Sequence, residues 1–179
     1  MMNFINKMKG VTNSPPLVPI SEVIWSWIGG FFGIASVAYL NQLYFTDNDL
    51  IFIIGSFGAS AVLIYGAPNV PYAQPRNLVG GHFISALIGV TFFKFLPDPI
   101  WLTSAMAVAT AIACMHLTKT IHPPGGATAL IAVIGSENIH QLGYFYAILP
   151  VLFGACLLLI IALLINNIPD SRQYPQFWR

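Results

Sequence analysis

The stretch from Thr120 to Leu130 reads Thr-Ile-His-Pro-Pro-Gly-Gly-Ala-Thr-Ala-Leu and interrupts an otherwise apolar chain. Proline lacks an N–H and its ring blocks the preceding helical turn, so no helix runs through Pro123 and Pro124. Proline does fit the first turn of a helix, where N–H groups have no intrahelical partner. We therefore predict that residues 121–124 are not helical and that a helix covers residues 125–135. Its free N–H groups and its dipole favour an anion at that end.

The composition points to a membrane. The chain has 179 residues, of which 56% are hydrophobic and 7% charged, and its mean hydropathy is +0.74. Soluble domains carry about 25% charged residues. So few charges cannot cover a surface in water, which predicts an all-α polytopic membrane protein with the lipid bilayer as partner. The net charge of +1 argues against nucleic acid as a partner.

Six apolar helical segments are predicted, over residues 22–44, 50–66, 78–96, 100–119, 125–135 and 142–166. They form a single transmembrane domain over 22–166, between polar tails at 1–21 and 167–179. The connections predicted between them are a polar turn at 46–49, a loop at 67–77 and a turn at 136–141.

The distribution of charge predicts an orientation. If all six segments cross and the N-terminus is cytoplasmic, one basic residue, Lys94, lies outside with Asp47, Asp49, Asp98 and Glu137. The other six basic residues lie inside, as the positive-inside rule expects: Lys7, Lys9, Arg76, Lys119, Arg172 and Arg179. We therefore expect both termini in the cytoplasm and the chain in the cytoplasmic (inner) membrane of a bacterium.

A short repeat lies within this pattern. Residues 58–63 read Gly-Ala-Ser-Ala-Val-Leu and residues 126–131 read Gly-Ala-Thr-Ala-Leu-Ile, an offset of 68. Each copy lies in the middle helix of a group of three. Because three is odd, the second group enters the membrane from the opposite side. The sequence thus predicts an inverted repeat of 3+3 helices, an arrangement common in transporters, with repeats over about 22–96 and 99–166.

Both middle helices are predicted to be short. Residues 125–135 cover about 16 Å as a helix, against about 30 Å of hydrocarbon. Residues 57–66 form a similar half-helix in the first repeat. In an inverted repeat the N-termini of the two half-helices meet near the bilayer midplane, where such backbone is tolerated if it is packed in protein or lines a polar cavity. Two positive helix ends facing one cavity predict a site for a small anion.

The residues His122-Pro123-Pro124-Gly125-Gly126-Ala127-Thr128-Ala129 resemble the motif that gives the HPP family of membrane proteins its name. Three earlier stretches also resemble the family: Gly55-Ser56-Phe57-Gly58-Ala59-Ser60-Ala61, Gln74-Pro75-Arg76-Asn77 and Gly80-Gly81-His82. The family is described as four-helix integral membrane proteins, and its plastid and cyanobacterial members are associated with nitrite transport. The resemblance therefore implies a nitrite transporter. The four helices agree with our six segments if the two half-helices are too short to be counted.

The candidate anion-binding residues come from the two helix starts and from the segments beside them. The second helix start contributes His122, Pro123, Pro124, Gly125, Gly126, Ala127 and Thr128. The first contributes Ser56, Phe57, Gly58, Ala59 and Ser60. The neighbouring segments contribute Arg76, Asn77, His82 and Lys119.

Each of these side chains also has a structural interpretation. His122 either binds the anion and gates it by protonation, since imidazole titrates near neutral pH, or caps backbone carbonyls at the break. Ser60 and Thr128 either bind the anion or bond their own carbonyls four residues earlier. Arg76 and Asn77 either attract anions or anchor the loop to lipid headgroups.

Two other function classes stay open beside small-anion transport. An enzyme with histidine-bound metal is disfavoured, because His116 and His122 are separated by the break and no His-Glu-x-x-His motif is present. We therefore expect no enzymatic activity, no metal and no other cofactor. An accessory or structural membrane subunit is the second alternative. The sequence leaves open channel or carrier, energy coupling, direction, and selectivity among nitrite, nitrate, cyanate, formate and chloride, and it permits a homo-oligomer.

Overall fold

The fold is taken from a computed structural model that describes residues 4–10, 12–44 and 53–179. In this part of the chain the α-helices are α1 (Ile20–Tyr44), α2 (Gly55–Gly66), α3 (Pro75–Phe95), α4 (Ile100–Leu117), α5 (Pro123–Ile134), α6 (Glu137–Leu142) and α7 (Phe153–Ile165). Short 3-10 helices cover Phe4–Met8 (η1), Pro71–Ala73 (η2) and Gly143–Ala147 (η3), and a π-helical turn covers Ile148–Leu152 (η4). The prediction of an all-helical protein is confirmed.

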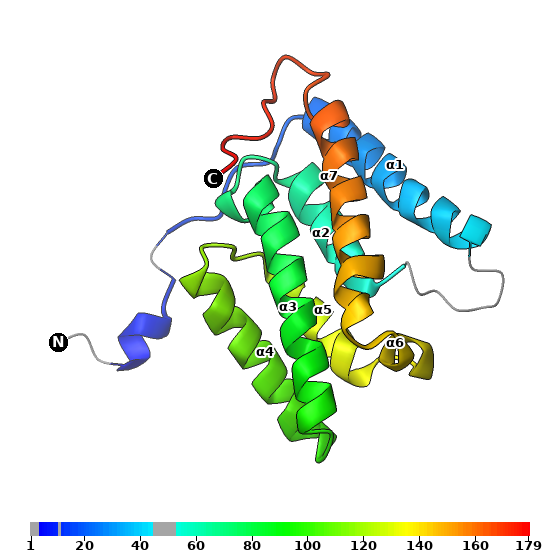
Figure 1. The fold of residues 1–179 in the computed structure, drawn as a ribbon. Coiled ribbons are helices and arrows are strands. Elements are labelled where there is room, and N and C mark those ends of the chain that lie inside the picture. Colours follow the sequence, from blue (N-terminus) through cyan, green and yellow to red (C-terminus); the bar gives the residue numbers. More distant parts are fainter. Residues whose placement is uncertain (1–3, 11, 45–52) are drawn as a thin grey trace.

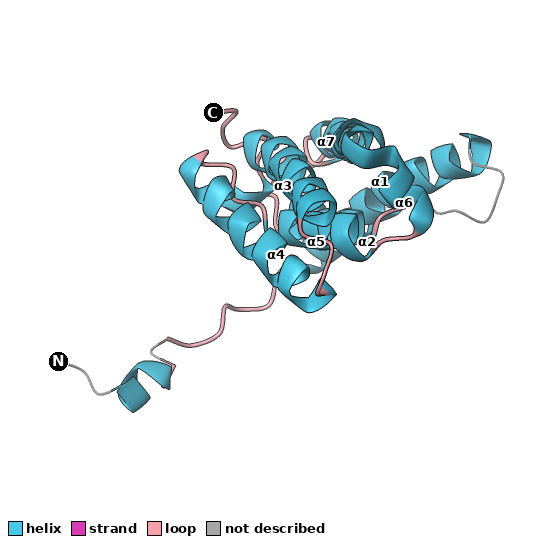
Figure 2. Ribbon diagram, turned by 60° about the horizontal axis from the view of Figure 1, so that its bottom comes forward, coloured by secondary structure: helices cyan, strands magenta, loops and turns pink. Residues whose placement is uncertain are grey.

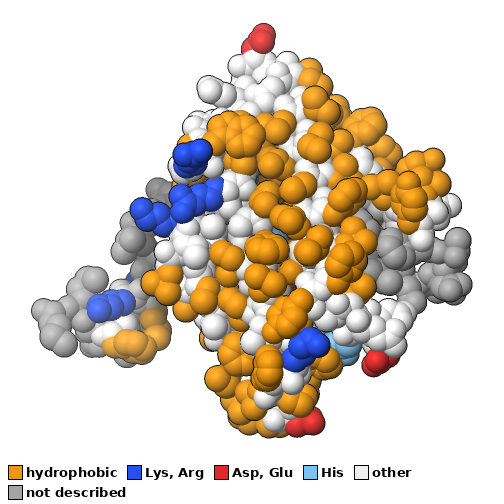
Figure 3. All heavy atoms as spheres, in the orientation of Figure 1, with side chains coloured by type: hydrophobic (Ala, Val, Ile, Leu, Met, Phe, Trp, Pro, Cys, Tyr) orange, Lys and Arg blue, Asp and Glu red, His pale blue; other side chains and the backbone are white. Residues whose placement is uncertain are grey.

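Four helical stretches among the described residues are long and apolar enough to cross a membrane: Ile20–Tyr44, Pro75–Phe95, Ile100–Leu117 and Glu137–Ile165. The apolar helices α2 and α5 have 12 residues each, or about 18 Å at 1.5 Å per residue. Figure 3 shows hydrophobic side chains spread over much of the face seen in Figure 1, as a protein surrounded by lipid requires.

The short helices α2 and α5 pack against each other and against longer helices. Helix α3 packs against α4, α5 and α7, while α1 packs against α2 and α7, and α4 against α3 and α5. Figures 1 and 2 show α1 and α4 on opposite flanks, with the other helices between them. The polar side chains of α2 and α5 (Ser56, Ser60 and Thr128) point into the bundle and are fully buried, while Val62 on the opposite face of α2 is exposed.

Small residues on α3 let α5 approach closely. Gly81, Ser85 and Gly89 recur every four residues and therefore lie on one face of the helix. A Cβ on Gly81 would lie 2.6 Å from the Cβ of His122, and one on Gly89 would meet the backbone of Ala129. Contact this close is typical of small residues at helix interfaces in membranes, and it sets α3 beside the start of α5.

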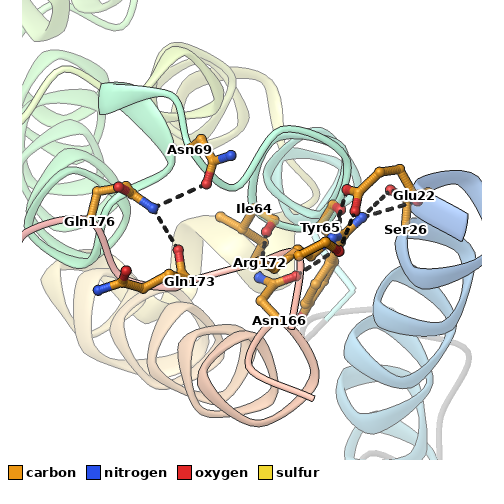
Figure 4. A network of polar contacts seen from close by, with 10 residues as sticks. Glu22, Ser26, Ile64, Tyr65, Asn69, Asn166, Arg172, Gln173 and Gln176 are labelled. Carbon is orange, nitrogen blue, oxygen red and sulfur yellow. Dashed lines mark hydrogen bonds and ion pairs between the residues drawn. The ribbon is translucent and has the colours of Figure 1, made fainter. Parts of the chain in front are cut away.

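A buried arginine joins three helix ends. Arg172, from the segment after α7, pairs with Glu22 at the start of α1 over 2.8 Å, as Figure 4 shows. Its guanidinium also donates to the carbonyl of Tyr65 at the end of α2 over 3.2 Å and to Oδ1 of Asn166 over 2.9 Å. Because the side chain of Arg172 is 1% exposed, it acts as a structural tie in this structure.

Several predicted boundaries differ from the structure. Helix α5 begins at Pro123, not at residue 125, because both prolines occupy its first turn, where a missing N–H costs nothing. The turn predicted at 136–141 is wrong. Ser136 holds the N-cap position, Glu137 follows in the first turn, and α6 forms over Glu137–Leu142 until Gly143 ends it with a φ of 53°.

The last predicted span is helical but broken. Leu149 has an extended backbone (φ −128°, ψ 117°) within the turn before α7. Pro150 follows it, and proline disfavours the helical conformation in the residue before it, so a continuous helix over 142–166 does not form. The polar turn predicted at 46–49 and the first residues of the segment predicted at 50–66 lie outside the described residues.

Candidate functional site: a buried chain of two histidines and three hydroxyls

A chain of hydrogen bonds links α2, α3, α5 and the loop between α2 and α3. Its members, in order, are the Tyr72 carbonyl and the side chains of His122, Ser60, His82, Thr128 and Ser56. All five side chains are 0% exposed. Polar side chains are costly inside a membrane protein, so five of them gathered in one chain mark this place as a candidate site.

His122 forms the first half of the chain. It holds the N-cap position of α5 with an extended backbone (φ −141°, ψ 103°). Its Nδ1 lies 2.7 Å from the carbonyl oxygen of Tyr72, and its Nε2 lies 2.8 Å from Oγ of Ser60 on α2. Because a carbonyl only accepts, Nδ1 carries a proton and Nε2 is the acceptor when the ring is neutral.

His82 forms the second half. Its Nε2 lies 2.7 Å from Oγ of Ser60, so one hydroxyl bridges both imidazoles. Its Nδ1 lies 2.7 Å from Oγ1 of Thr128, which donates to Oγ of Ser56 over 2.9 Å. Phe57 meets the His82 ring edge-on at 5.5 Å between centroids. The two imidazole centroids are 4.9 Å apart.

Proton counting shows what this chain can hold. With both rings neutral, His122 donates to Tyr72, Ser60 to His122, His82 to Ser60, and Thr128 to His82. When Thr128 donates instead to Ser56, Nδ1 of His82 must donate to Thr128. All the bonds are then kept only if one of the two rings carries a second proton. One extra proton is therefore accommodated with every bond between these side chains kept, while the Ser60 hydroxyl, which has a single proton, gives up its 3.1 Å contact with the residue 56 carbonyl.

The extra proton has two locations. If it is on His82, Ser60 donates to His122; if it is on His122, Ser60 donates to His82. Moving the proton between the rings requires only that the Ser60 hydroxyl exchange its donor and acceptor roles. This arrangement has the form of a proton relay, and its bonds of 2.7–2.8 Å are short enough for transfer.

The start of α5 differs from the predicted array of free N–H groups. Pro123 and Pro124 have no N–H, and the N–H of Gly125 donates to the carbonyl of His122 over 2.8 Å. Gly125 is also enclosed, because a Cβ there would lie 2.8 Å from Oγ of Ser85 and 3.0 Å from Sδ of Met115. At this helix end the imidazole of His122, rather than the backbone, offers the hydrogen-bonding groups.

The remaining predicted site residues lie outside the buried series of hydrogen bonds. Asn77 is buried, and its Nδ2 donates to the carbonyl of Ile121 over 2.7 Å, one residue before His122. Arg76 is exposed and donates to the carbonyl of Thr118 over 2.7 Å. Pro124 is buried and its carbonyl accepts from Thr128 over 3.4 Å, while Gly126 and Ala127 are half-buried, and Gly58, Ala59, Pro123 and Lys119 are exposed.

Sequence reasoning missed two partners of the chain. One is the backbone carbonyl of Tyr72, which has no signature in a sequence because every residue carries one. The other is Tyr146, whose hydroxyl donates to the carbonyl of Thr128 over 3.3 Å. The proximity of Tyr146 depends on the break before α7, which the sequence did not predict.

Comparison with known proteins agrees with the motifs. The family described as HPP, transmembrane region, matches residues 15–175. A transmembrane protein of Dictyostelium discoideum is 43% identical over 99% of this chain and 58% of its own length. A second one from the same organism is 40% identical over 94% of this chain and 60% of its own length.

This protein thus spans about three-fifths of the length of the curated relatives that it matches. No solved structure matches it. The family match covers most of the chain, including α1–α7 and every residue of the buried chain described above. This protein is therefore a member of the HPP family of integral membrane proteins.

Proposed function

We propose that this protein transports a small inorganic anion, nitrite, across its membrane, and that the buried histidine–hydroxyl chain serves that transport. The observation that carries the proposal is the position of this chain. It joins the first two turns of the short helices α2 and α5 through His122, Ser60, Thr128 and Ser56, in the interior of an apolar helical bundle. A packed core gains nothing from two imidazoles that apolar residues could replace.

The predicted inverted repeat supports a transport site at this crossing. Adding the offset of 68 to Gly55 and Gly66, the ends of α2, gives 123 and 134, the ends of α5. Oγ of Ser60 lies 3.1 Å from the carbonyl oxygen of residue 56, and Oγ1 of Thr128, its equivalent, lies 3.4 Å from the carbonyl oxygen of residue 124. Equivalent hydroxyls thus make equivalent bonds in the two half-helices.

The crossing also supports the expectation that the two helix starts meet. Ser56 in the first turn of α2 contacts Thr128, and Ser60 contacts His122 at the N-cap of α5. The residues in contact run in opposite orders along the two helices, so the helices cross in antiparallel fashion with their N-terminal ends together. We place this crossing near the bilayer midplane, with both chain termini in the cytoplasm of a bacterium.

Proton uptake and anion binding help each other in this mechanism. An anion beside the chain stabilises its singly protonated form by charge attraction, and the protonated chain in turn attracts the anion. The positive ends of α2 and α5 add to the attraction, within reach of the same groups. Nitrite binding should therefore be linked to the uptake of one proton by the pair of imidazoles.

Anion-dependent stabilisation in detergent tests the proposal against a purely structural role. A ligand that binds only the folded protein adds about 2.7 kcal/mol at 100 times its Kd. We expect sodium nitrite to raise the melting temperature more than nitrate, cyanate, formate or chloride at equal ionic strength. Equal curves for all five salts would favour an accessory subunit in which the buried chain only fixes the helix crossing.

A further inference from the structure

A pocket lined by basic residues lies outside the buried histidine–hydroxyl chain. A pocket of about 400 Å³ is lined by Pro71, Arg76, Asn77, Lys119, Phe177 and Arg179. Three of these residues are cations. Figure 3 shows Lys and Arg side chains gathered on the side of the molecule where Figure 1 places the C-terminal segment. No Asp or Glu is among the residues that line this pocket, and the ion pair found among residues 4–10, 12–44 and 53–179 joins Arg172 to Glu22.

The C-terminal segment completes the pocket. The buried hydroxyl of Tyr174 donates to the carbonyl of Ala73 over 2.7 Å. Burial raises the pKa of Tyr174, so this hydroxyl keeps its proton and its donor role at neutral pH. The N–H of Gln176 donates to Oε1 of Gln74 over 2.7 Å, and its Nε2 donates to Oδ1 of Asn69 over 3.1 Å, the latter visible in Figure 4. These bonds hold Phe177 and Arg179 against the start of α3.

Lys119 occupies a backbone position that favours glycine. Helix α4 ends at Thr118, and the N–H groups of Lys119 and Thr120 bond back to the carbonyls of His116 (3.2 Å) and Met115 (2.8 Å). This is a Schellman motif, in which the residue after the cap is left-handed and usually glycine. Lys119 adopts that conformation with a φ of 56°. A left-handed backbone costs a lysine conformational free energy that a glycine would not lose. The charge of Lys119 therefore explains its presence at this position better than a role in folding does.

The pocket also lies next to the buried chain. Pro71 in its wall precedes Tyr72, whose carbonyl binds His122. Asn77, also in the wall, binds the carbonyl of Ile121, which precedes His122. The first turn of α3, which contains Arg76 and Asn77, adds the positive end of a 21-residue helix. Charge, helix dipole and position therefore converge on one opening.

We propose that this pocket binds an oxyanion, held by Arg76, Lys119 and Arg179, before it reaches the buried chain. The same chemistry suits a free inorganic anion or the phosphate of an anionic phospholipid, because both present charged oxygens to guanidinium and ammonium groups. The choice of nitrite as the free anion rests on the proposed function. The pocket itself rests only on the geometry of these residues.

The test compares two double variants with the same loss of charge. Lys119→Gly/Arg179→Gln removes two pocket cations, and glycine relieves the left-handed backbone at position 119. Lys9→Gln/Lys94→Gln removes two exposed cations that do not line the pocket. Arg76 is left intact because it ties α3 to the carbonyl of Thr118. The melting temperatures of the full-length variants show whether each folds, and Lys119→Gly alone should match or exceed the parent protein.

Binding of sodium nitrite is measured by calorimetry in detergent, and binding of phosphatidylglycerol by native mass spectrometry. We expect the Kd for nitrite to rise about tenfold in the pocket variant, since two partly exposed ion pairs are lost, and less than twofold in the control variant. A selective loss of phosphatidylglycerol alone would assign the oxyanion to lipid phosphate. Equal affinities of the two variants for both ligands would contradict the proposal that this pocket binds an oxyanion.

The outcomes separate this proposal from the transport function. If the pocket variant keeps the parental affinity for both ligands and the parent protein carries nitrite into liposomes, the pocket proposal is wrong and the transport proposal stands. Selective loss of nitrite binding in the pocket variant, in a parent protein without flux, would keep the pocket and contradict transport.

Discussion

His122 has its roles set by the groups on both sides of its ring. The Tyr72 carbonyl fixes Nδ1 as a donor, and Ser60 bonds Nε2. Of the two interpretations that the sequence left open, a bond to a backbone carbonyl is observed, and anion binding with gating by protonation stays a prediction. The ring binds a backbone carbonyl in the loop between α2 and α3, not one at the break, and it also joins a series of hydrogen bonds that can hold a proton.

This double role gives a prediction about pH. An anion stabilises the protonated chain, so by linkage nitrite binding should tighten by about tenfold from pH 8 to pH 6, the factor that about 1.4 kcal/mol produces. Nitrite itself stays ionised in this range. His122→Gln keeps a donor for the Tyr72 carbonyl but removes one of the two proton locations, so its affinity should change less with pH than that of the parent protein. Calorimetric titrations at pH 6, 7 and 8 measure both proteins, and identical slopes would mean that His122 is only a cap.

The individual members of the site could be predicted better than their contacts. His82, His122, Ser60 and Thr128 were candidates because polar side chains in an apolar chain are costly. That one hydroxyl bridges two imidazoles depends on the crossing of α2, α3 and α5, which no local pattern encodes. The role of Arg179 in the pocket was missed for a related reason, since it depends on hydrogen bonds from Tyr174 and Gln176 to residues about 100 positions earlier.

At the scale of the elements, prolines and glycines in the sequence located both short helices. The sequence placed the helices within two residues of their observed starts, at Gly55 and Pro123. The prediction was wrong between residues 136 and 152. A short helix, α6, forms in place of the predicted turn, and the backbone breaks before Pro150 in place of a continuous helix. Local signals conflict there, because apolar residues favour one long helix and the proline interrupts it.

The packing of α5 against α3 and α4 predicts unequal effects at two adjacent glycines. A Cβ on Gly125 would lie 2.8 Å from Oγ of Ser85 and 3.0 Å from the Gly81 carbonyl, whereas one on Gly126 would meet only Val108 at 3.8 Å. Gly125→Ala should therefore destabilise the protein by about 1–3 kcal/mol through overpacking. Gly126→Ala should be neutral or slightly stabilising, since alanine favours the helix. Thermal unfolding in detergent measures both, and equal melting temperatures would contradict this packing.

At the scale of the whole molecule, four of the seven basic residues (Arg76, Lys119, Arg172 and Arg179) gather at one end. Arg76 contacts the end of α4, Arg179 shares its pocket with Lys119, and Arg172 joins the start of α1 to the segment after α7. Lys94 lies near the other end of α3, close to Gly143. This separation supports a cytoplasmic location for the first group under the positive-inside rule.

Cysteine labelling of intact cells tests this orientation. Single cysteines are placed at Glu137 and Gln173, in a background in which Cys114 and Cys156 are replaced by alanine. A membrane-impermeant maleimide should label the cysteine at position 137 in intact cells and the one at position 173 only after lysis. Labelling of position 173 alone in intact cells would reverse the orientation.

The most direct test of transport is the rate of nitrite uptake into liposomes that contain the purified protein. Protein-free liposomes measure the leak of nitrous acid, and Ser60→Ala breaks the bridge between His82 and His122. We predict uptake by the parent protein well above the leak and faster at pH 6 than at pH 8. We also predict that a folded Ser60→Ala variant takes up nitrite at less than about a tenth of that rate, the loss that about 1.4 kcal/mol produces. Uptake by the parent protein at the rate of protein-free liposomes, or by Ser60→Ala at the parental rate, would contradict the proposal.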